Sequence, residues 1–387
     1  MSRGFSDAGF EVLLAADKNP AAVETYSRNF SHPALELDLS SFVNLPSASV
    51  IVGGPPCQGF SSAGARREGD PRNTLVGTFA RIIATQRPKA FVFENVEGFL
   101  TGEGGAHVLE LLRPLISSGY RIHLKKINAA NYGVPQHRKR VVAIGGLGWD
   151  PTFPEPTHAA FGAPGATSHA THLQLCPTVS DALKGLPQAA VGGSGHPQGH
   201  SYKELSSSAR LRAEQLMPGM TMRDLPVSLQ HLSYQRRSKR RVSDGTPSER
   251  RGGAPAGVRR LSPDEPSKAI TSGASTEFLH PRDHRNITLR ECARLQTFED
   301  DFIFCGSPSD QALLIGNAVP PLLALQIALQ LRKDLESAKQ LHETGALLSF
   351  VPTRSSGMSP ALQRTSDLVA RQTGVNIEQE ELPFVFV

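Results

Sequence analysis

Residues 50–61 read VIVGGPPCQGFS, an apolar run that leads directly into a loop with two glycines, two prolines and one cysteine. The run at residues 50–52 is short, β-branched and bounded by glycine, which predicts a buried strand. A loop after such a strand lies at the carboxyl edge of an open α/β sheet, where ligands bind. The glycines allow close backbone approach and the prolines stiffen the loop, so Cys57 is held in one place. Cys57 is therefore a candidate nucleophile, although an isolated cysteine in a tight turn is more often structural.

Short apolar runs of the same kind recur across the first 150 residues and alternate with helical patterns. Asn19 and Pro20 form one clear helix start, an N-cap followed by proline at the first helical position. Strands that alternate with helices predict an α/β fold with a doubly wound, mostly parallel sheet covered on both faces. The strands are expected at residues 12–16, 50–52, 91–93 and 141–144, and the helices at residues 20–29, 74–86, 107–117, 288–296 and 320–339.

Composition divides the chain into four segments. Residues 1–149 carry the alternating pattern, whereas residues 150–257 are rich in Pro, Gly, Ser and His and predict a smaller, loop-rich domain. The alternating pattern returns over residues 258–340. Residues 341–387 lose it again, which predicts a poorly ordered C-terminal tail.

The net charge of +5 is modest but unevenly distributed. Residues 231–260 contain nine Lys or Arg residues against two acidic ones, the footprint of a polyanionic partner, although a solvated basic loop explains this charge equally well.

Four cysteines without a CxxC pair argue against a disulfide framework or a structural zinc site and favour the cytoplasm. Because the chain has no apolar run of about eighteen residues and no secretory signal, we expect no membrane span.

Two further motifs carry chemistry. Residues 91–96 read FVFENV, an apolar strand that ends in the carboxyl group of Glu94. Partial desolvation at a strand rim lets an acid donate a proton near neutral pH, while an acid that only begins a helix is equally common there.

Residues 136–140 read QHRKR before an expected strand, so Arg138 and Arg140 can project to the same side. Arginine donors suit base oxygens, carboxylates and phosphates, and the alternative is a surface basic cluster.

In this order, the cysteine loop, FVFENV and QHRKR resemble the motifs of bacterial DNA cytosine-5 methyltransferases of the restriction–modification type. The segment at residues 260–296 and GNAVPP at residues 316–321 extend the resemblance, which covers residues 2–145 and 258–337. It implies an S-adenosylmethionine-dependent methyltransferase fold, in which residues 1–149 and 258–340 form the catalytic domain and residues 150–257 the target-recognition domain. We expect the segment at residues 260–296 to be mainly structural.

The resemblance also implies a mechanism. The target cytosine flips out of the duplex, because its ring cannot be reached inside the stack. Cys57 adds to C6 while Glu94 supports protonation at N3, C5 then takes the methyl group, and loss of the C5 proton releases Cys57. Arg140 would help to hold the cytosine and Cys57, and Arg138 would lie nearer the backbone or the catalytic loop. The reaction needs no metal.

A site for S-adenosylmethionine follows from the same resemblance. Asp17 comes directly after an expected strand, where an acid can accept hydrogen bonds from ribose hydroxyls. Asp38 and Leu39 resemble the pair that contacts adenine, and Asn317 would lie nearest the cofactor. Either acid by itself would more often be a turn residue or a cap. The residues expected at the cofactor are Phe5, Asp17, Lys18, Asp38, Leu39, Pro55 and Asn317.

Double-stranded DNA is the expected partner. The residues expected to contact it are Gln58, Ser61, Gln136, Arg236, Arg237, Arg240 and Arg241. The four arginines are expected at phosphates, because most contacts in such interfaces go to the backbone. We also expect a cognate restriction endonuclease encoded nearby, a monomeric enzyme, and a location in the bacterial cytoplasm at the nucleoid.

One motif of the family is absent. Its first motif is a strand that ends in Asp-x-Phe-x-Gly-x-Gly-Gly, and SRGFSDAGF at residues 2–10 resembles what should follow that loop. The missing strand would lie centrally, between the strands that end near Ala16 and Val52. We expect Met1 to be an internal methionine of a longer natural protein; the alternative is a truncated chain with weak or no activity. An RNA cytosine-5 methyltransferase and a catalytically dead DNA-binding protein remain as alternative functions.

Overall fold

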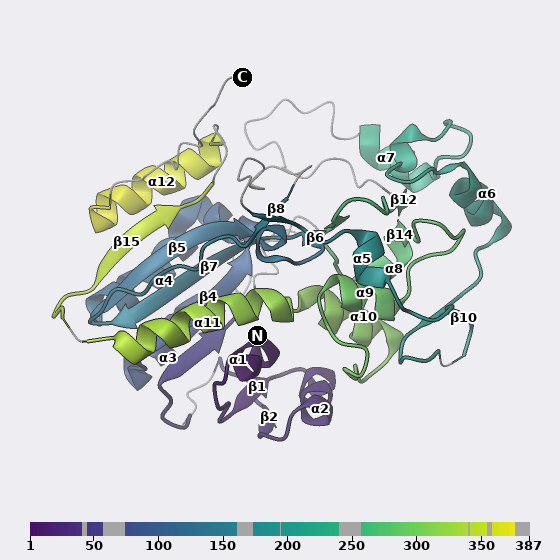
Figure 1. Ribbon diagram of the computed structural model, residues 1–387. Helices are drawn as coiled ribbons and strands as arrows, with labels where there is room; N and C mark the ends of the chain where they lie inside the picture. Colours follow the sequence, from purple (N-terminus) through teal and green to yellow (C-terminus); the bar gives the residue numbers. More distant parts are fainter. Residues whose placement is uncertain are drawn as a thin grey trace.

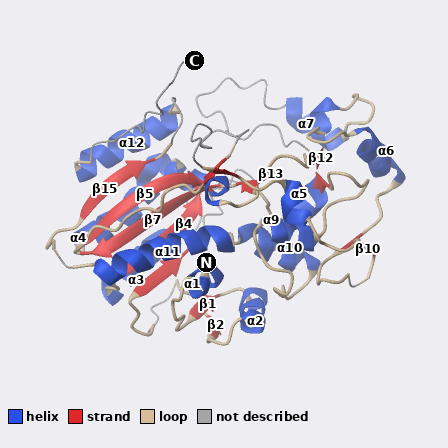
Figure 2. Cartoon of the chain, viewed as in Figure 1, coloured by secondary structure: helices blue, strands red, loops and turns tan. Residues whose placement is uncertain are grey.

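The computed structural model describes residues 1–40, 45–56, 74–160, 173–193, 195–239, 257–339, 341–353 and 358–375. Their elements form two lobes (Figures 1 and 2). A larger lobe holds the main sheet with helices on both of its faces, and a smaller lobe consists of short helices and two-residue strands joined by long loops. The expected α/β fold with a smaller, loop-rich part is therefore confirmed.

The main sheet has five strands in the order β15–β5–β7–β4–β3. Four strands run in one direction, and β7 is antiparallel to both of its neighbours. The connection from β5 to β7 is short and holds no crossover helix, so the two strands pair antiparallel. The bounds are β3 (Val50–Gly53), β4 (Ala90–Val96), β5 (Tyr120–Asn128), β7 (Lys139–Leu147) and β15 (Ala346–Val351). Three of these strands contain runs expected from the sequence, whereas β5 and β15 were not foreseen.

Side-chain alternation along the central strands builds a core on each face. Phe91 and Phe93 of β4 pack toward the helices on one face, and Ala90 and Val92 pack toward those on the other. The first face is covered by α3 (Thr74–Gln86), α4 (Ala106–Ser117) and α12 (Pro360–Thr373), and the second by α1 (Ser2–Asp7) and α11 (Pro321–Ser337). The sheet is thus buried on both faces, as its apolar strands predict.

The N-terminal strands form a separate unit. Strands β1 (Ala15–Asp17) and β2 (Ala34–Glu36) pair in parallel as a two-stranded sheet, joined by α2 (Pro20–Asn29). Asn19 caps α2 as expected, with its side chain accepting a hydrogen bond from the Ala21 amide at 3.0 Å. Within the described residues, β1 and β2 do not join the main sheet, and β3 pairs with β4 alone.

The expectation of a poorly ordered C-terminal tail is wrong for its first part. Strand β15 pairs in parallel with β5, and its Phe350 is fully buried in the core. Helix α12 packs on α4 and on the short helix η3 (Gly102–Gly105), and Thr365 Oγ1 donates to the Leu100 carbonyl at 2.8 Å. The sequence contains a signal for each element: an apolar run at residues 346–351 for β15, and Ser359 as the N-cap of α12. Residues 376–387 lie outside the described part.

The smaller lobe takes in more of the chain than residues 150–257. Val179 shares one core with Leu261, Ile270, Leu295 and Ile315, which lie in the segment assigned to the catalytic domain. The chain returns to the main sheet only at α11. The elements of this lobe are β8 (His158–Ala159), β9 (Gln174–Leu175), α5 (Val179–Leu183), β10 (Ala190–Val191), β11 (Ser201–Tyr202), α6 (Ser207–Gln215), η5 (Met222–Asp224), α7 (Leu232–Lys239), β12 (Arg259–Arg260), β13 (Ser267–Lys268), α8 (Ala274–Glu277), β14 (Phe278–Leu279), α9 (Leu289–Leu295) and α10 (Pro308–Asn317).

Among the described residues, one stretch has the length and composition of a membrane-crossing helix: Pro308–Ser337, in which an 18-residue window has a mean hydropathy of 1.8. It comprises two helices, α10 and α11, with a break at residues 318–320. Leu323, Ile327 and Leu331 of α11 are buried against the main sheet. Core packing therefore accounts for its apolar character.

Candidate active site

An ion pair between Glu94 and Arg140 lies at the carboxyl edge of the sheet. Glu94 is near the end of β4 and Arg140 near the start of β7, and the antiparallel register of these strands brings them together. Arg140 Nε lies 2.7 Å from Glu94 Oε1, and the two side chains are only 14% and 11% exposed. Such a shielded, charge-assisted bond fixes the orientation of the carboxyl group.

The loop that carries the cysteine starts beside this carboxyl group. A Cβ atom on Gly54 would lie 3.2 Å from Glu94 Oε2, so glycine permits the close approach of the loop. Asn95 Nδ2 donates to the Pro55 carbonyl at 3.2 Å and ties the loop to β4. Asn95 was expected only as part of FVFENV, with no role of its own, and its contact with the loop is a finding of the structure. Cys57, Gln58 and Ser61 lie outside the described residues.

Two of the other cysteines, Cys176 and Cys292, are buried and differ from a reactive cysteine. Burial raises the pKa of Cys176 to about 12, and Asp181 adds to this shift. Burial also raises the pKa of Cys292 strongly. These two groups are thiols rather than thiolates at neutral pH, and the thiolate is the nucleophilic form.

Gln136 is a structural residue, which corrects the expected DNA contact. Its side chain is fully buried and donates to the Leu295 carbonyl at 2.7 Å and to Gln296 Oε1 at 2.8 Å. Its oxygen accepts from the Ile270 amide at 3.0 Å. All of its polar groups are engaged inside the protein, so none is left at a surface that DNA could reach.

Arg138 likewise supports the structure instead of facing the reaction. It is 1% exposed, and burial, followed by the neighbouring Arg140 charge, lowers its pKa well below the usual value. Its guanidinium donates to the carbonyls of Ile270 (2.7 Å), Gly316 (2.7 Å) and Ala318 (3.0 Å). Arg138 lies between the strand β6 (Gln136–His137) and β7, so the alternation expected through Arg140 is interrupted there.

Two carboxyl groups follow adjacent parallel strands at the expected cofactor side. Asp17 ends β1, is exposed, and accepts a hydrogen bond from the Asn19 amide at 2.9 Å. Asp38 follows β2 and is also exposed; hydrogen bonds from Ser40, and to a smaller extent the charge of Lys18, lower its pKa. Carboxyl acceptors at two neighbouring strand ends suit ribose hydroxyls and an adenine amino group.

Other expected cofactor residues are placed differently. Phe5 is 4% exposed and packs in the core with Phe10, at 5.2 Å between ring centroids, so it supports the site from behind. Leu39 and Pro55 are half-buried, and Lys18 and Asn317 are exposed. Asn317 ends α10, between the two carbonyls that Arg138 holds. The chemistry of this set fits S-adenosylmethionine.

The basic stretch before residue 261 has two kinds of arginine. Arg236 is exposed on α7, as a phosphate contact requires. Arg260 is 3% exposed and donates to the carbonyls of Ala213, Leu216, His280 and Asp283, so it is structural. The Arg237 side chain, Arg240 and Arg241 lie outside the described part.

The segment at residues 260–296 has the structural role expected of it. Arg285 forms a bidentate pair with the buried Glu291, at 2.9 and 2.8 Å. Arg290 donates to the carbonyls of Gln198, Glu299 and Phe302. These interactions hold the loops of the smaller lobe together.

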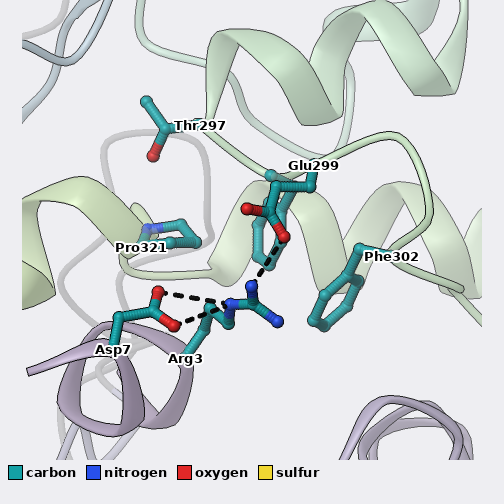
Figure 3. A pocket seen from close by; sticks show the side chains of 7 residues that line it. Arg3, Asp7, Thr297, Glu299, Phe302 and Pro321 are labelled. Atoms are coloured by element: carbon teal, nitrogen blue, oxygen red, sulfur yellow. Dashed lines mark hydrogen bonds and ion pairs between the residues drawn. The ribbon is translucent and has the colours of Figure 1, made fainter. Parts of the chain in front are cut away.

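A small pocket lies between α1, the loop after α9 and the start of α11 (Figure 3). Arg3 is paired there with Glu299 at 2.7 Å and with Asp7 at 3.2 Å. Its lining residues are Arg3, Asp7, Thr297, Phe298, Glu299, Phe302 and Pro321. None of the expected cofactor residues is among them.

The fold is shared with solved cytosine-5 methyltransferases. The structure superposes with a TM-score of 0.64 on a prophage-encoded DNA modification methyltransferase of E. coli, at 24% identity, covering 87% of this chain and 96% of that one. Dnmt2 methyltransferase of S. pombe gives a TM-score of 0.55 at 16% identity, covering 87% and 96% of the two chains. The shared architecture is thus an α/β fold with a mixed sheet.

Sequence comparison gives the family. Residues 1–333 match the profile of the C-5 cytosine-specific DNA methylases, and the chain belongs to this family. Type II methyltransferase M1.HphI of Haemophilus parahaemolyticus is 34% identical over 84% of this chain and 82% of its own length. Type II methyltransferase M.NgoFVII of Neisseria gonorrhoeae is 31% identical over 88% and 86%. The protein is therefore an enzyme of DNA cytosine methylation related to restriction–modification methyltransferases.

Proposed function

We propose that this chain transfers a methyl group from S-adenosylmethionine to C5 of a cytosine flipped out of a specific duplex DNA sequence, through a covalent bond between Cys57 and C6. The observation that carries the proposal is the Glu94–Arg140 ion pair, with the start of the cysteine loop against its carboxyl group. This arrangement brings an acid, a fixed guanidinium and the loop of the candidate nucleophile to one edge of the sheet.

The residues divide the chemistry between them. The Cys57 thiolate forms a bond to C6, and Glu94 supports protonation at N3, so electron density shifts to C5. Arg140 holds the carboxyl group and contacts the base. When bound, S-adenosylmethionine would supply an electrophilic methyl group for C5, and the neutral thioether S-adenosylhomocysteine would be the leaving group. Loss of the C5 proton to a base then restores the double bond and expels Cys57.

Binding of the cofactor is assigned to residues at the strand ends. Asp17 accepts from the ribose hydroxyls, Asp38 accepts from the adenine amino group, and Leu39 packs on the ring. Lys18, Pro55 and Asn317 complete the site. The support for this assignment is that Asp17 ends β1, while Asp38 and Pro55 follow β2 and β3, all exposed or half-buried.

DNA binding is assigned to the cysteine loop and to the basic stretch of the smaller lobe. Gln58 and Ser61 would contact the strand beside the flipped base, and Arg236, Arg237, Arg240 and Arg241 would contact phosphates. We further propose that the enzyme acts as a monomer in the bacterial cytoplasm, at the nucleoid. A cognate restriction endonuclease encoded nearby is proposed because the relatives are type II methyltransferases.

Transfer of a labelled methyl group from S-adenosylmethionine tests the proposal. The expected result is incorporation into duplex DNA at cytosine C5, with none for Cys57→Ser. Incorporation into tRNA but not DNA would replace this function by an RNA cytosine-5 methyltransferase activity. DNA binding with no incorporation into either substrate would leave a DNA-binding protein without catalysis.

A further inference from the structure

Thr297 has a backbone conformation that its side chain disfavours. It follows α9 and has a φ of +67°, in the left-handed region that β-branched residues rarely adopt. Strain of this kind persists where the surrounding structure requires it and is often linked to function. At Thr297 the backbone closes the C-terminus of α9, because the Thr297 and Phe298 amides donate to the Arg294 and Ala293 carbonyls at 2.8 and 2.9 Å. In this conformation its hydroxyl also accepts a hydrogen bond from the Leu322 amide at 3.1 Å.

This hydrogen bond caps α11 from outside the helix. The first amides of a helix have no partner within it, and the residue before α11, Pro320, provides no side-chain cap. Pro321 has no amide hydrogen, so Leu322 carries the first donor of the helix. Figure 3 shows the Thr297 hydroxyl directed toward Pro321, at the start of α11.

The neighbouring residue holds the helix that comes before. Gln296 is fully buried, and its Nε2 donates to the Ile315 carbonyl in the last turn of α10 at 2.6 Å. Gln296 and Thr297 therefore form hydrogen bonds with the end of α10 and the start of α11, respectively. The segment between these two contacts, residues 316–321, contains Asn317.

Arg138 fixes the same segment from the other side. Its bonds to the Gly316 and Ala318 carbonyls flank Asn317. A Cβ atom on Gly316 would lie 2.3 Å from the Ser272 amide nitrogen, so the segment is pressed against that backbone. The Asn317 side chain itself remains exposed. The carbonyls on either side of Asn317 are thus held, while its own side-chain amide is exposed and open to a ligand.

We propose that Gln296 and Thr297 are positioning residues that hold Asn317 against the methyl donor. The proposal rests on the proposed function for the identity of the ligand. The left-handed conformation that closes α9 also places the Thr297 hydroxyl on the Leu322 amide. A merely structural role would affect folding alone, whereas a positioning role affects cofactor affinity.

The test compares Thr297→Val with Thr297→Ser. Valine keeps the shape and the β-branching of threonine but cannot accept a hydrogen bond, and serine keeps the hydroxyl. Three quantities are measured: hydrogen exchange of the Leu322 amide, the dissociation constant of S-adenosylhomocysteine, and the dissociation constant of duplex DNA. Thr297→Val is expected to speed the exchange and to weaken S-adenosylhomocysteine binding about tenfold, the effect of leaving one donor unpaired, with DNA binding unchanged. Thr297→Ser should behave as the wild type.

Kinetics provide a second readout. For a positioning role, Thr297→Val raises the KM for S-adenosylmethionine and leaves kcat near the wild-type value. Wild-type exchange and affinity in Thr297→Val would overturn the proposal, as would a Thr297→Ser variant that loses as much affinity as Thr297→Val. A wild-type chain that binds no S-adenosylhomocysteine refutes the proposed function, whereas unchanged Leu322 exchange in Thr297→Val refutes the capping role.

Discussion

Glu94 and Arg140 face each other across the antiparallel pairing of β4 and β7, with 2.7 Å between carboxyl oxygen and guanidinium nitrogen. The pair is nearly closed to solvent, and the cysteine loop begins against its other oxygen. One ion pair thus joins two motifs that are 46 residues apart in the sequence.

Glu94→Gln is expected to lower kcat for methyl transfer by about 10²- to 10⁴-fold, the usual range for loss of acid–base catalysis. Arg140→Gln should have a similar effect, and the double variant should be little worse than either, because the two residues act as a unit. Steady-state transfer of labelled methyl groups measures this. Arg121→Gln is the control, because Arg121 pairs with Asp150 at the opposite edge of the sheet. Additive losses in the double variant would show that the two groups act independently.

Alanine substitutions at the adjacent glycines Gly53 and Gly54 should have different effects, one on stability and the other on catalysis. In Gly54→Ala the new Cβ would lie 3.2 Å from Glu94 Oε2, so methyl transfer should slow while the free energy of unfolding changes by less than about 1 kcal/mol. In Gly53→Ala it would lie 2.6 Å from the buried Phe79 ring, which should cost about 1–3 kcal/mol of stability. Urea unfolding and turnover, measured on both variants, separate the effects. Equal destabilisation of the two would contradict the placement of Gly54 at the carboxyl group.

Arg138→Met should destabilise the protein by about 3 kcal/mol or more, because three buried carbonyls lose their donor. The free energy of unfolding in urea measures this loss. Arg236→Gln, at an exposed position, is the control and should change stability by less than about 0.5 kcal/mol. If Arg138→Met were as stable as the control, the guanidinium would not be a structural tie between the lobes.

Acid should weaken the smaller lobe through Glu291. Burial disfavours its charged form, but the Arg285 guanidinium more than offsets this, so the pKa of Glu291 lies below its usual value. A lowered folded-state pKa stabilises the fold at every pH above the unfolded pKa of about 4.3, and this stability is lost as the pH falls through the folded pKa. The free energy of unfolding measured from neutral pH down to about pH 3 should therefore fall more steeply in the wild type than in Glu291→Gln. If the free energies of unfolding of the two proteins fell in parallel as the pH drops, Glu291 would not couple protonation to stability.

The sequence predicted the elements whose signals are local. Helix α2 has the expected bounds because Asn19 and Pro20 define its start, and β4 carries near its end the acid that follows its apolar run. Long-range pairing was harder to foresee. The reversed direction of β7 and the pairing of β15 with β5 depend on contacts between distant segments, which periodicity does not encode.

The arginines of QHRKR show the same limit at the site. Arg138 and Arg140 are two residues apart, and alternation predicts a shared face. The break between β6 and β7 separates them, so Arg140 meets Glu94 while Arg138 reaches the segment around Asn317. Gln136 was assigned to DNA by its place in a basic motif, but burial decided its role. No local pattern reveals a break of this kind.

The central claim, covalent catalysis by Cys57, is tested most directly by trapping. The folded protein is mixed with S-adenosylmethionine and a long PCR product in which 5-fluorocytosine replaces cytosine, because fluorine at C5 blocks the elimination that releases the enzyme. The account predicts a denaturation-resistant protein–DNA adduct that requires the cofactor and is absent for Cys57→Ser. A folded, cofactor-supplied wild-type protein that forms no adduct, or a Cys57→Ser variant that does, would contradict it.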